Sequence, residues 1–304
     1  MHDQLPVSVR ALVEASLADN THRSYGGVIK NFKSWCAERR KSPLPAEPLT
    51  IAEYLSDLVT AGRRGSTLKV HAAAIAYDHR RADMENPIDS YLVRAVLRGA
   101  MRLRGGYVGQ KRPVVSEELA LILQHMPPTL RGLRDRAMIA LGFAGAFRRS
   151  ELAALRLEDL TFSERGLTVC IRRSKTDFER KGTSIGIPNG RYLKPVEALQ
   201  KWIAAAGITR GPIFRPVFHD YSEARSITPY TVSRVLKTYL DKANLDATQY
   251  GAHSLRAGFI TDAADFGVDV ERIMDHSRHA TRNSVKIYVR RANLFRNHPG
   301  EGFL

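Results

Sequence analysis

The segment 253-HSLRAGFITDAADFGVDVERIMDHSRHATRNSVKIYVRR-291 is the part of the chain that says most about its fold. The spacing of its apolar residues predicts three helices in succession, Ser254–Phe266, Val270–His276 and Arg282–Ala292. The C-terminal third of the chain is therefore expected to be helical. The histidines, the arginines and the tyrosine of this segment would lie on these helices or beside them.

The sequence just before this segment predicts more helices and one hairpin. Leu167–Arg173 alternates like a strand, and Thr183–Pro188 is its expected antiparallel partner across the charged turn KTDFERKG. Thr228 followed by Pro229 is a good helix start. The other helices are expected at Ser116–His125, Leu133–Ala146 (apolar on most faces and so buried), Pro195–Ala206 and Pro229–Lys242. Together these patterns predict a mainly α domain with a small antiparallel β-sheet.

The first hundred residues predict a second helical domain. Its four helices are expected to begin at an Asn20–Thr21 cap, at a Thr50–Glu53 capping box, at Gly65–Ser66 and near Ser90. Residues 105–113 combine glycine, basic residues and proline, a composition typical of a linker. We therefore place an N-terminal domain at 1–104, a basic linker at 105–113 and a second domain at 114–304.

The chain carries a formal net charge of +16 and has a pI near 10.1. Residues 1–110 hold sixteen Lys and Arg against eleven Asp and Glu, so both domains are basic. Such a surplus favours a highly negative partner, and DNA is the usual one. A membrane partner is not expected, because there is no apolar run of about 18 residues and no signal-peptide layout at the N-terminus.

The chain has two cysteines, Cys36 and Cys170. Both lie in apolar patterns, so both are expected to be buried small hydrophobes. Two such cysteines suit a reducing cytoplasm better than a disulfide scaffold. We accordingly expect a cytoplasmic, nucleoid-associated protein.

The sequence lacks the usual motifs for metal or nucleotide chemistry. It has no GxxxxGK[ST] loop, no CxxC pair and no HExxH motif. Its Asp and Glu residues are scattered instead of clustered around two magnesium ions. Chemistry on DNA is therefore expected to need no metal and no cofactor. It would need protein cations, best of all guanidinium groups, around the phosphate and a side chain that attacks it.

Four short motifs supply such side chains. They are FRRSEL with Arg148 and Glu151, SKT with Lys175, HSLR with His253 and Arg256, and HATRNSVKIY with His279 and Tyr288. In this order they resemble the tyrosine recombinase (phage integrase) family, and the resemblance covers nearly the whole chain. The family's last His or Trp stands nine residues before its nucleophilic tyrosine, as His279 stands before Tyr288. The family commonly has glycine before this histidine, where this chain has Arg278, so the shape of that loop is left open.

The resemblance implies a role for each of these side chains. Tyr288 would attack the scissile phosphate to give a 3′-phosphotyrosine link and a free 5′-hydroxyl. Arg148 and Arg256 would hold the nonbridging oxygens, and Lys175 would protonate the leaving 5′-oxygen. Because the covalent link stores the phosphodiester bond, strand exchange would need no ATP.

The resemblance also implies roles for the two histidines and the glutamate. His253 would act as acid or base near the tyrosine, and His279 would donate a hydrogen bond to the phosphate. Glu151 would orient Arg148 and His253. Three assignments have an alternative nearby in the sequence. Arg149 could take the place of Arg148, and Lys181, Arg172 or Arg173 could take the place of Lys175. His276 could take the place of His279, although the nine-residue spacing to Tyr288 favours His279. Tyr221, Tyr239 and Tyr250 are expected to be structural.

The two basic domains suggest a two-domain clamp around duplex DNA, which is also the family architecture. The helix TPYTVSRVLKTYL resembles the family helix that enters the major groove, so Tyr230 and Arg234 are candidate base readers. Lys69, Arg80 and Arg81 are candidate phosphate contacts, or simply solvated charges.

The family resemblance also implies the form of the DNA target. It would be an inverted repeat around a spacer, with one protomer on each arm and a homotetramer on two sites. Leu294 and Phe295 near the C-terminus are candidates for docking on a neighbouring protomer. Two other functions fit parts of the pattern: a type IB topoisomerase, and a DNA-binding regulator without catalysis, although no catalytic position is lost here.

Overall fold

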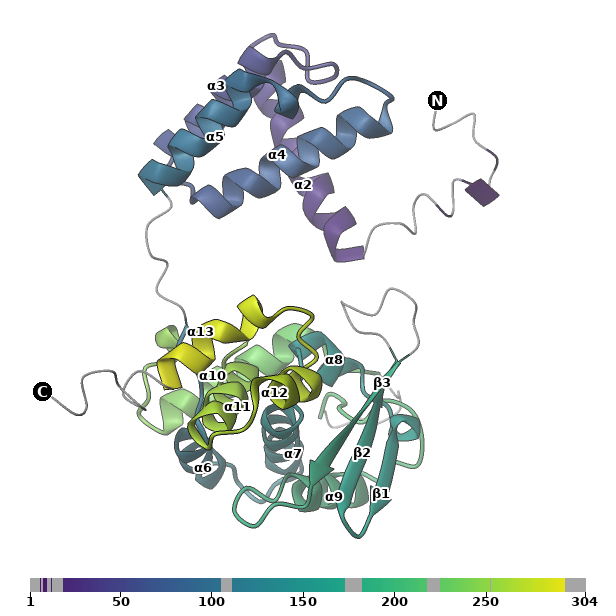
Figure 1. Ribbon diagram of the computed structural model, residues 1–304. Helices are drawn as coiled ribbons and strands as arrows, with labels where there is room; N and C mark the ends of the chain where they lie inside the picture. The colour runs from purple at the N-terminus through teal and green to yellow at the C-terminus, as the bar shows by residue number, and fades with distance from the viewer. Residues whose placement is uncertain are drawn as a thin grey trace, which may run out of the picture. The chain divides into compact units, whose positions relative to one another are not determined.

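Helices form most of the described chain, and one small sheet accompanies them (Figure 1). The computed structural model describes residues 6, 8, 9, 12, 19–104, 111–172, 182–217, 225–251 and 253–292. The chain divides into two units, 1–109 and 110–304, which are treated separately below. The mainly α fold class with a small antiparallel sheet is confirmed. Most of the expected linker, residues 105–110, lies outside the described residues, as do Leu294, Phe295 and Tyr221.

The N-terminal unit packs its helices around one apolar cluster. Phe32 and Cys36 from one helix meet Tyr54 and Leu55 from the next, and all four are buried. Within residues 19–104 the helices of this unit are α2 (Asp19–Glu38), α3 (Pro48–Thr60), α4 (Gly65–Arg81) and α5 (Tyr91–Arg104), with a 3₁₀ turn η2 at Pro87–Asp89. Each of the four helices expected in this part of the chain is thus present.

Two of the expected helix starts in this unit are wrong. Helix α2 begins at Asp19, so Asn20 and Thr21 lie within it instead of preceding it. Helix α3 begins at Pro48, and Thr50 is buried inside its first turn. Proline has a fixed φ suited to the first helical position, so Pro48 starts the helix before the Thr50 cap could act.

The C-terminal unit contains eight described helices, three strands and two 3₁₀ turns. The helices are α6 (Ser116–Gln124), α7 (Leu130–Ala144), α8 (Arg149–Ala154), α9 (Pro195–Ala205), α10 (Pro229–Lys242), α11 (Ser254–Asp265), α12 (Val270–Ser277) and α13 (Arg282–Ala292), with turns η3 (Leu157–Asp159) and η4 (Ala247–Gln249). The predicted N-cap is confirmed, because the Thr228 side chain accepts a hydrogen bond from the Thr231 N–H.

The strands form an antiparallel sheet in the order β1 (Leu160–Ser163), β2 (Gly166–Ile171), β3 (Thr183–Pro188). Val169 pairs with Ile185, which confirms the expected β2–β3 hairpin. Between these strands, residues 173–181 lie outside the described residues. Strand β1 is an addition that the sequence did not predict. Cys170 is exposed, so its predicted burial was wrong: alternate residues of β2 face opposite sides, and Cys170 is on the outer one.

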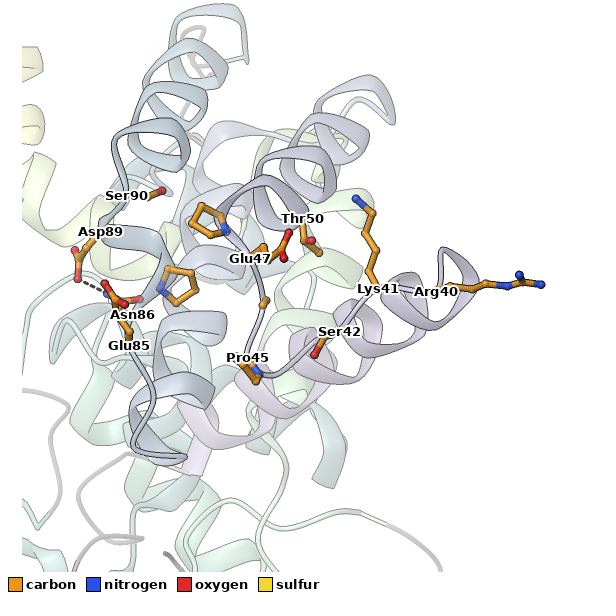
Figure 2. Close-up of a pocket in the computed structure, with 13 residues that line it drawn as sticks. Arg40, Lys41, Ser42, Pro45, Glu47, Thr50, Glu85, Asn86, Asp89 and Ser90 are labelled. Atoms are coloured by element: carbon orange, nitrogen blue, oxygen red, sulfur yellow. Dashed lines mark hydrogen bonds between the residues drawn. The ribbon is translucent and has the colours of Figure 1, made fainter.

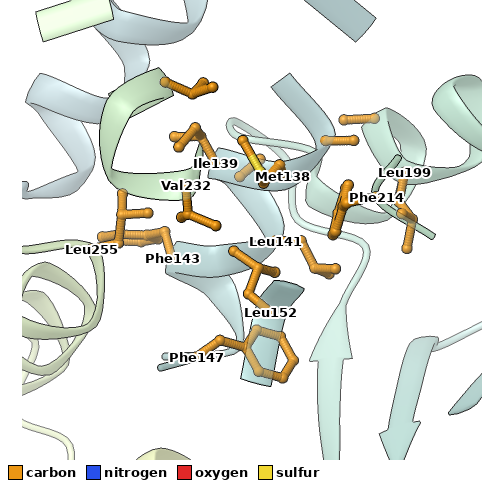
Figure 3. Packing of buried hydrophobic residues seen from close by; sticks show 14 of the residues in the cluster. Met138, Ile139, Leu141, Phe143, Phe147, Leu152, Leu199, Phe214, Val232 and Leu255 are labelled. Atoms are coloured by element: carbon orange, nitrogen blue, oxygen red, sulfur yellow. The ribbon is translucent and has the colours of Figure 1, made fainter. Parts of the chain in front are cut away.

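Helix α7 is buried along most of its length, and Figure 3 shows part of the apolar cluster to which it contributes. Met138, Ile139 and Leu141 are fully buried in one cluster with side chains of α8, α9, α10 and α11. Helix α11 packs closely as well, since a Cβ on Gly258 would lie 1.7 Å from the carbonyl oxygen of Val114. This packing fixes the ends of α7, α8 and α11, where the candidate site residues lie.

Candidate active site

Arg148 lies in the tight connection between α7 and α8. Its backbone N–H donates to Glu151 Oε2 at 2.9 Å, and its Nη1 donates to Glu151 Oε1 at 2.5 Å. Glu151 Oε2 therefore caps the start of helix α8, while Oε1 holds the Arg148 side chain. Arg149, the alternative, is the first residue of α8 and is exposed, while the Arg148 side chain is only 16% exposed. The geometry thus favours Arg148 as the arginine of this site.

Glu151 is the buried anion of the site, with a side chain that is 2% exposed. Burial alone would raise the pKa of this carboxyl group. The guanidinium group of Arg278 and the hydrogen bonds from Arg148 outweigh that effect, so the pKa of Glu151 is below its usual value. Glu151 is therefore a carboxylate at neutral pH, and its contacts include Arg148, as expected from the sequence, and Arg278, which was not expected.

Arg278 ends helix α12 in the left-handed conformation, with φ 57° and ψ 47°. This backbone shape is the one that glycine adopts most easily, so the arginine keeps the loop shape that glycine would allow. The Arg278 side chain points inward and is 4% exposed. Its Nη2 donates to Glu151 Oε2 at 3.0 Å and to the carbonyl oxygen of Ala146 at 2.9 Å.

Arg256, on α11, approaches the same carbonyl from another side. Its Nη1 donates to the Ala146 oxygen at 2.9 Å, and its Nη2 lies 3.3 Å from both ring nitrogens of His279. Burial, together with the charges of Arg148 and Arg278, lowers the pKa of Arg256 to about 9. Arg256 is thus still a cation at neutral pH, held close to two others.

His279 is a neutral imidazole at neutral pH. Burial, followed by the charges of Arg256, Arg148, Arg278 and His253, lowers the pKa of His279 to about 4. Its Nδ1 is 2.7 Å from Ser277 Oγ, which itself donates to the carbonyl oxygen of Ile273 at 2.6 Å. The short contact with Ser277 favours one tautomer, in which Nδ1–H donates to Ser277 Oγ, so Arg256 Nη2 can donate to Nε2 only.

Tyr288 and His253 complete this group of side chains. Tyr288 lies on α13, half-buried against Ile260 and Val285, and its phenol acts on the pKa of Arg256. His253 precedes α11, is exposed and acts on the pKa of His279. The structure therefore brings together Arg148, Glu151, His253, Arg256, His279 and Tyr288 from four elements of the chain.

Other candidates take different positions. Lys175, Lys181 and Arg173 lie outside the described residues, so the choice among the basic residues of that turn stays open. His276 contacts the carbonyl oxygen of Ala144 through Nε2 at 2.8 Å and stacks on Phe259. That packing role leaves His279 as the histidine that faces the arginines.

Tyr239 and Tyr250 are buried, as expected for structural tyrosines. Tyr250 donates a hydrogen bond to Glu118 Oε1 at 2.7 Å, and Tyr239 donates one to Asp135 Oδ2 at 3.3 Å. Burial raises the pKa of both phenols to about 12. Among the described residues, neither tyrosine contacts Arg148, Arg256 or Arg278.

The candidate DNA-contacting residues are all exposed. Tyr230 and Arg234 are four residues apart on α10 and so share a face. Lys69, Arg80 and Arg81 are exposed on α4. A further basic stripe on α5 was missed, although its spacing of four residues was visible in the sequence: Arg94, Arg98 and Arg102, all exposed.

A separate hollow of about 770 Å³ lies in the N-terminal unit (Figure 2). Its lining mixes cations such as Lys41 with acids such as Glu47, Glu85 and Asp89, and none of the predicted site residues lines it. Neither in this hollow nor elsewhere in the described part of the chain do three His, Cys, Asp or Glu side chains gather in a way that could hold a metal ion. None of its helices is both long and apolar enough to cross a membrane.

The site has three guanidinium groups around a single carboxylate, with a tyrosine and two histidines beside them. The guanidinium groups can bind an anion, and the tyrosine is a nucleophile that can attack it. Residues 114–294 match the sequence pattern of the phage integrase family. The chain is also 36% identical over 303 residues to the integrase/recombinase XerD homolog of Selenomonas ruminantium, covering 97% of this chain and 89% of that protein. The chain therefore belongs to the phage integrase family, and it is a site-specific tyrosine recombinase.

Solved structures share the fold at lower identity. A lambda integrase dimer bound to a COC′ core site is 20% identical, with a TM-score of 0.64 over 95% of both chains. XerH recombinase bound to palindromic difH substrate, in a post-cleavage complex, is 19% identical with a TM-score of 0.61, covering 84% of this chain and 71% of that one. These likenesses support the two-domain integrase-like fold.

Proposed function

We propose that this recombinase cuts DNA by attack of the Tyr288 phenol oxygen on the scissile phosphate. The new bond joins the Tyr288 oxygen to phosphorus, and the bond from phosphorus to the 5′-oxygen breaks. The products are a 3′-phosphotyrosine link and a free 5′-hydroxyl on the other strand end. Reversal by a 5′-hydroxyl from a partner site rejoins the strands through a Holliday junction, without ATP and without a metal ion.

Arg148 and Arg256 bind the nonbridging oxygens of the phosphate. His279 donates a further hydrogen bond to it through Nε2, once that nitrogen has gained a proton in the complex with DNA. Preorganised donors of this kind stabilise the charge that develops in the transition state. Glu151 orients Arg148 and, as proposed from the sequence, His253. The observation that carries this proposal is the set of three guanidinium groups around one buried carboxylate, because it leaves a local excess of positive charge beside Tyr288.

Two proton transfers accompany the reaction. The phenol proton of Tyr288 passes to His253 acting as a base, and Lys175 gives a proton to the leaving 5′-oxygen. The exposure of His253 at the start of α11 and its electrostatic effect on His279 support its place beside the reacting phosphate.

The two units would act together on the duplex. Residues 1–104 would form the core-binding domain, 105–113 the linker and 114–304 the catalytic domain, arranged as a clamp. Lys69, Arg80 and Arg81 would contact phosphates, while Tyr230 and Arg234 would read bases. The exposure of all five side chains supports these roles.

The proposed target is an inverted repeat around a spacer, recombined by a homotetramer on two sites. Support comes from the similar structures: XerH is bound to a palindromic substrate, and lambda integrase is a dimer bound to a core site. A Leu294–Phe295 contact with a neighbouring protomer would be one means of assembly.

The proposal can be tested by selecting recombined sites from a randomised inverted-repeat library. The recovered duplex, nicked close to the cleavage point, should then trap a covalent complex that survives a denaturing gel. Tyr288→Phe should bind this duplex as the wild type does but form no such complex, while the control Tyr239→Phe should form it. A covalent complex with Tyr288→Phe would contradict the assignment, and relaxation of supercoils without any recombined product would favour the topoisomerase.

A further inference from the structure

Arg278 is a buried cation for which the proposed reaction has no role. Its guanidinium group is 4% exposed, and its backbone is in a conformation that side chains other than glycine rarely adopt. Burial lowers the pKa of Arg278, which reflects the cost of removing this charge from water. Both features disfavour an arginine here, so its contacts have to compensate for them.

The contacts of Arg278 join three segments of the site. Nη1 donates to the carbonyl oxygens of Gly145 at 3.1 Å and His276 at 2.7 Å. Nη2 donates to the Ala146 carbonyl and to Glu151, and the group lies over the Phe147 ring, 5.3 Å from its centroid. The side chain thus ties the end of α12 to the connection between α7 and α8.

Arg278 contributes to two of the contacts that hold the Arg148 side chain. Arg148 Nη1 donates to Glu151 Oε1, while Arg278 binds the other oxygen, Oε2. Arg148 Nη2 donates to the backbone carbonyl oxygen of Arg278 at 3.3 Å. One partner of Arg148 is therefore Arg278 itself, and another is a carboxylate that Arg278 keeps in place.

Arg256 is linked to Arg278 through one shared acceptor. The carbonyl oxygen of Ala146 accepts from Arg278 Nη2 and from Arg256 Nη1, both at 2.9 Å. A carbonyl oxygen has two lone pairs, so these two donors use its full capacity. Movement of one guanidinium group would free a lone pair and change the position of the other.

We propose that Arg278 is a positioning residue that holds both phosphate-binding arginines, Arg148 and Arg256, in their reactive orientation through Glu151 and the Ala146 carbonyl. This inference rests on the proposed function of Arg148 and Arg256. Arg278 itself touches neither the phosphate nor Tyr288 in the proposed reaction.

The kinetic test compares Arg278→Gly, Arg278→Met and Arg278→Lys in the full-length protein. The first relieves the backbone strain, the second keeps the apolar stem, and the third keeps the charge but loses the planar fork. With the nicked duplex recovered by the selection above, single-turnover cleavage should fall on the order of 100-fold for Gly and Met, with unchanged DNA affinity. Arg278→Lys should also cleave more slowly, because one ammonium group cannot serve four acceptors.

A matched control separates positioning from general stability. Arg134→Met also removes a buried guanidinium group from an ion pair, with Asp135, in the same unit but away from the site. Its thermal midpoint should fall, while the cleavage rate of the folded protein should stay near that of the wild type. Cleavage by folded Arg278→Gly and Arg278→Met within twofold of the wild type would overturn the inference. If these two variants do not fold, cleavage by Arg278→Lys within twofold of the wild type would overturn the inference instead.

A second readout needs no DNA. The ring of His279 is affected by Arg256, Arg148, Arg278 and His253, so loss of the Arg278 charge should move its NMR titration to higher pH in Arg278→Met. Arg278→Lys should shift it less. An unchanged titration would mean that Arg278 is not held against the site. If the wild type forms no covalent complex, the proposed function fails, and this titration alone decides whether Arg278 organises the cluster.

Discussion

Replacement of Glu151 by glutamine should destabilise the C-terminal unit strongly. The carboxylate is 2% exposed and shares its two oxygens between Arg148 and Arg278. Glutamine can offer its carbonyl oxygen to one of these arginines, but its NH₂ group then faces the other donor. Removal of one partner from a buried ion pair costs about 3–5 kcal/mol, because an uncompensated charge stays buried. That is a large part of the roughly 5–15 kcal/mol that stabilises a typical domain.

Urea unfolding can measure this loss in the unit that carries the site. The chain has two tryptophans, Trp35 in the N-terminal unit and Trp202 fully buried in α9. In a Trp35→Phe background, the fluorescence of Trp202 reports on the C-terminal unit alone. With an m-value of about 2 kcal/mol/M, a loss of about 4 kcal/mol moves the midpoint down by about 2 M. Glu197→Gln, on the exposed face of α9, is the control and should leave the midpoint nearly unchanged.

The pH dependence gives the sign of the effect. The pKa of Glu151 is lower in the folded protein than in the unfolded chain, so its contribution is complete above the unfolded value of about 4.3. That contribution is lost as the pH falls through the folded value. The gap between Glu151→Gln and the wild type should therefore be full at pH 7 and should narrow in acid. A gap below about 1 kcal/mol at pH 7 would refute the reasoning, since that is the size of an exposed ion pair.

Three further predictions concern other side chains. Lys175→Ala should lose cleavage of an ordinary duplex and regain it with a 5′-phosphorothiolate, whose sulfur leaves without a proton; absence of rescue would move the acid to Lys181 or another neighbour. His279, with a pKa of about 4 in the free protein, should gain a proton when DNA places a phosphate beside it. Calorimetry in buffers of different ionisation enthalpy should then show proton uptake that His279→Gln abolishes, and equal uptake by both would show that the proton is taken up elsewhere than at His279. Cys170 should react with a thiol reagent in the folded protein while Cys36 does not; mass spectrometry that finds Cys36 labelled first would contradict the packing of α2.

The helices that the sequence predicted best are those with strong local signals. Pro229–Lys242 and Arg282–Ala292 have the predicted bounds, and the Thr228 cap with Pro229 explains the first of them. Errors arose where two local signals compete, as Pro48 does with Thr50. Strand β1 was missed because three of its four residues are exposed, so it has no alternation to detect. The exposure of Cys170 could have been foreseen, because the predicted strand already placed it opposite Val169 and Ile171.

The predicted site depended on spacing within short motifs, and spacing could not reveal how distant segments share partners. Arg148 and Glu151 are three residues apart at a helix start, so their contact could be anticipated. Three of the partners of Arg278 lie more than 120 residues away in the chain, at Glu151, Gly145 and Ala146. No periodicity encodes such contacts, and the sequence left the shape of the loop at Arg278 open.

The free site carries more positive charge than its own anion can neutralise. Arg148, Arg256 and Arg278 surround Glu151, and each depresses the pKa of His279 because a fourth positive charge would add to the repulsion. Folding therefore brings like charges together at a cost, which the rest of the unit has to offset. On the proposed function, a phosphate diester supplies the missing negative charge and relieves that repulsion, so the strain in the free protein becomes binding energy at the atoms that react. A site of this kind should discriminate strongly against uncharged linkages. Replacing the scissile phosphate by a neutral methylphosphonate should weaken the binding of that linkage by the site. The loss should be larger in the wild type than in Arg278→Met, because Arg278 keeps the other two guanidinium groups in place.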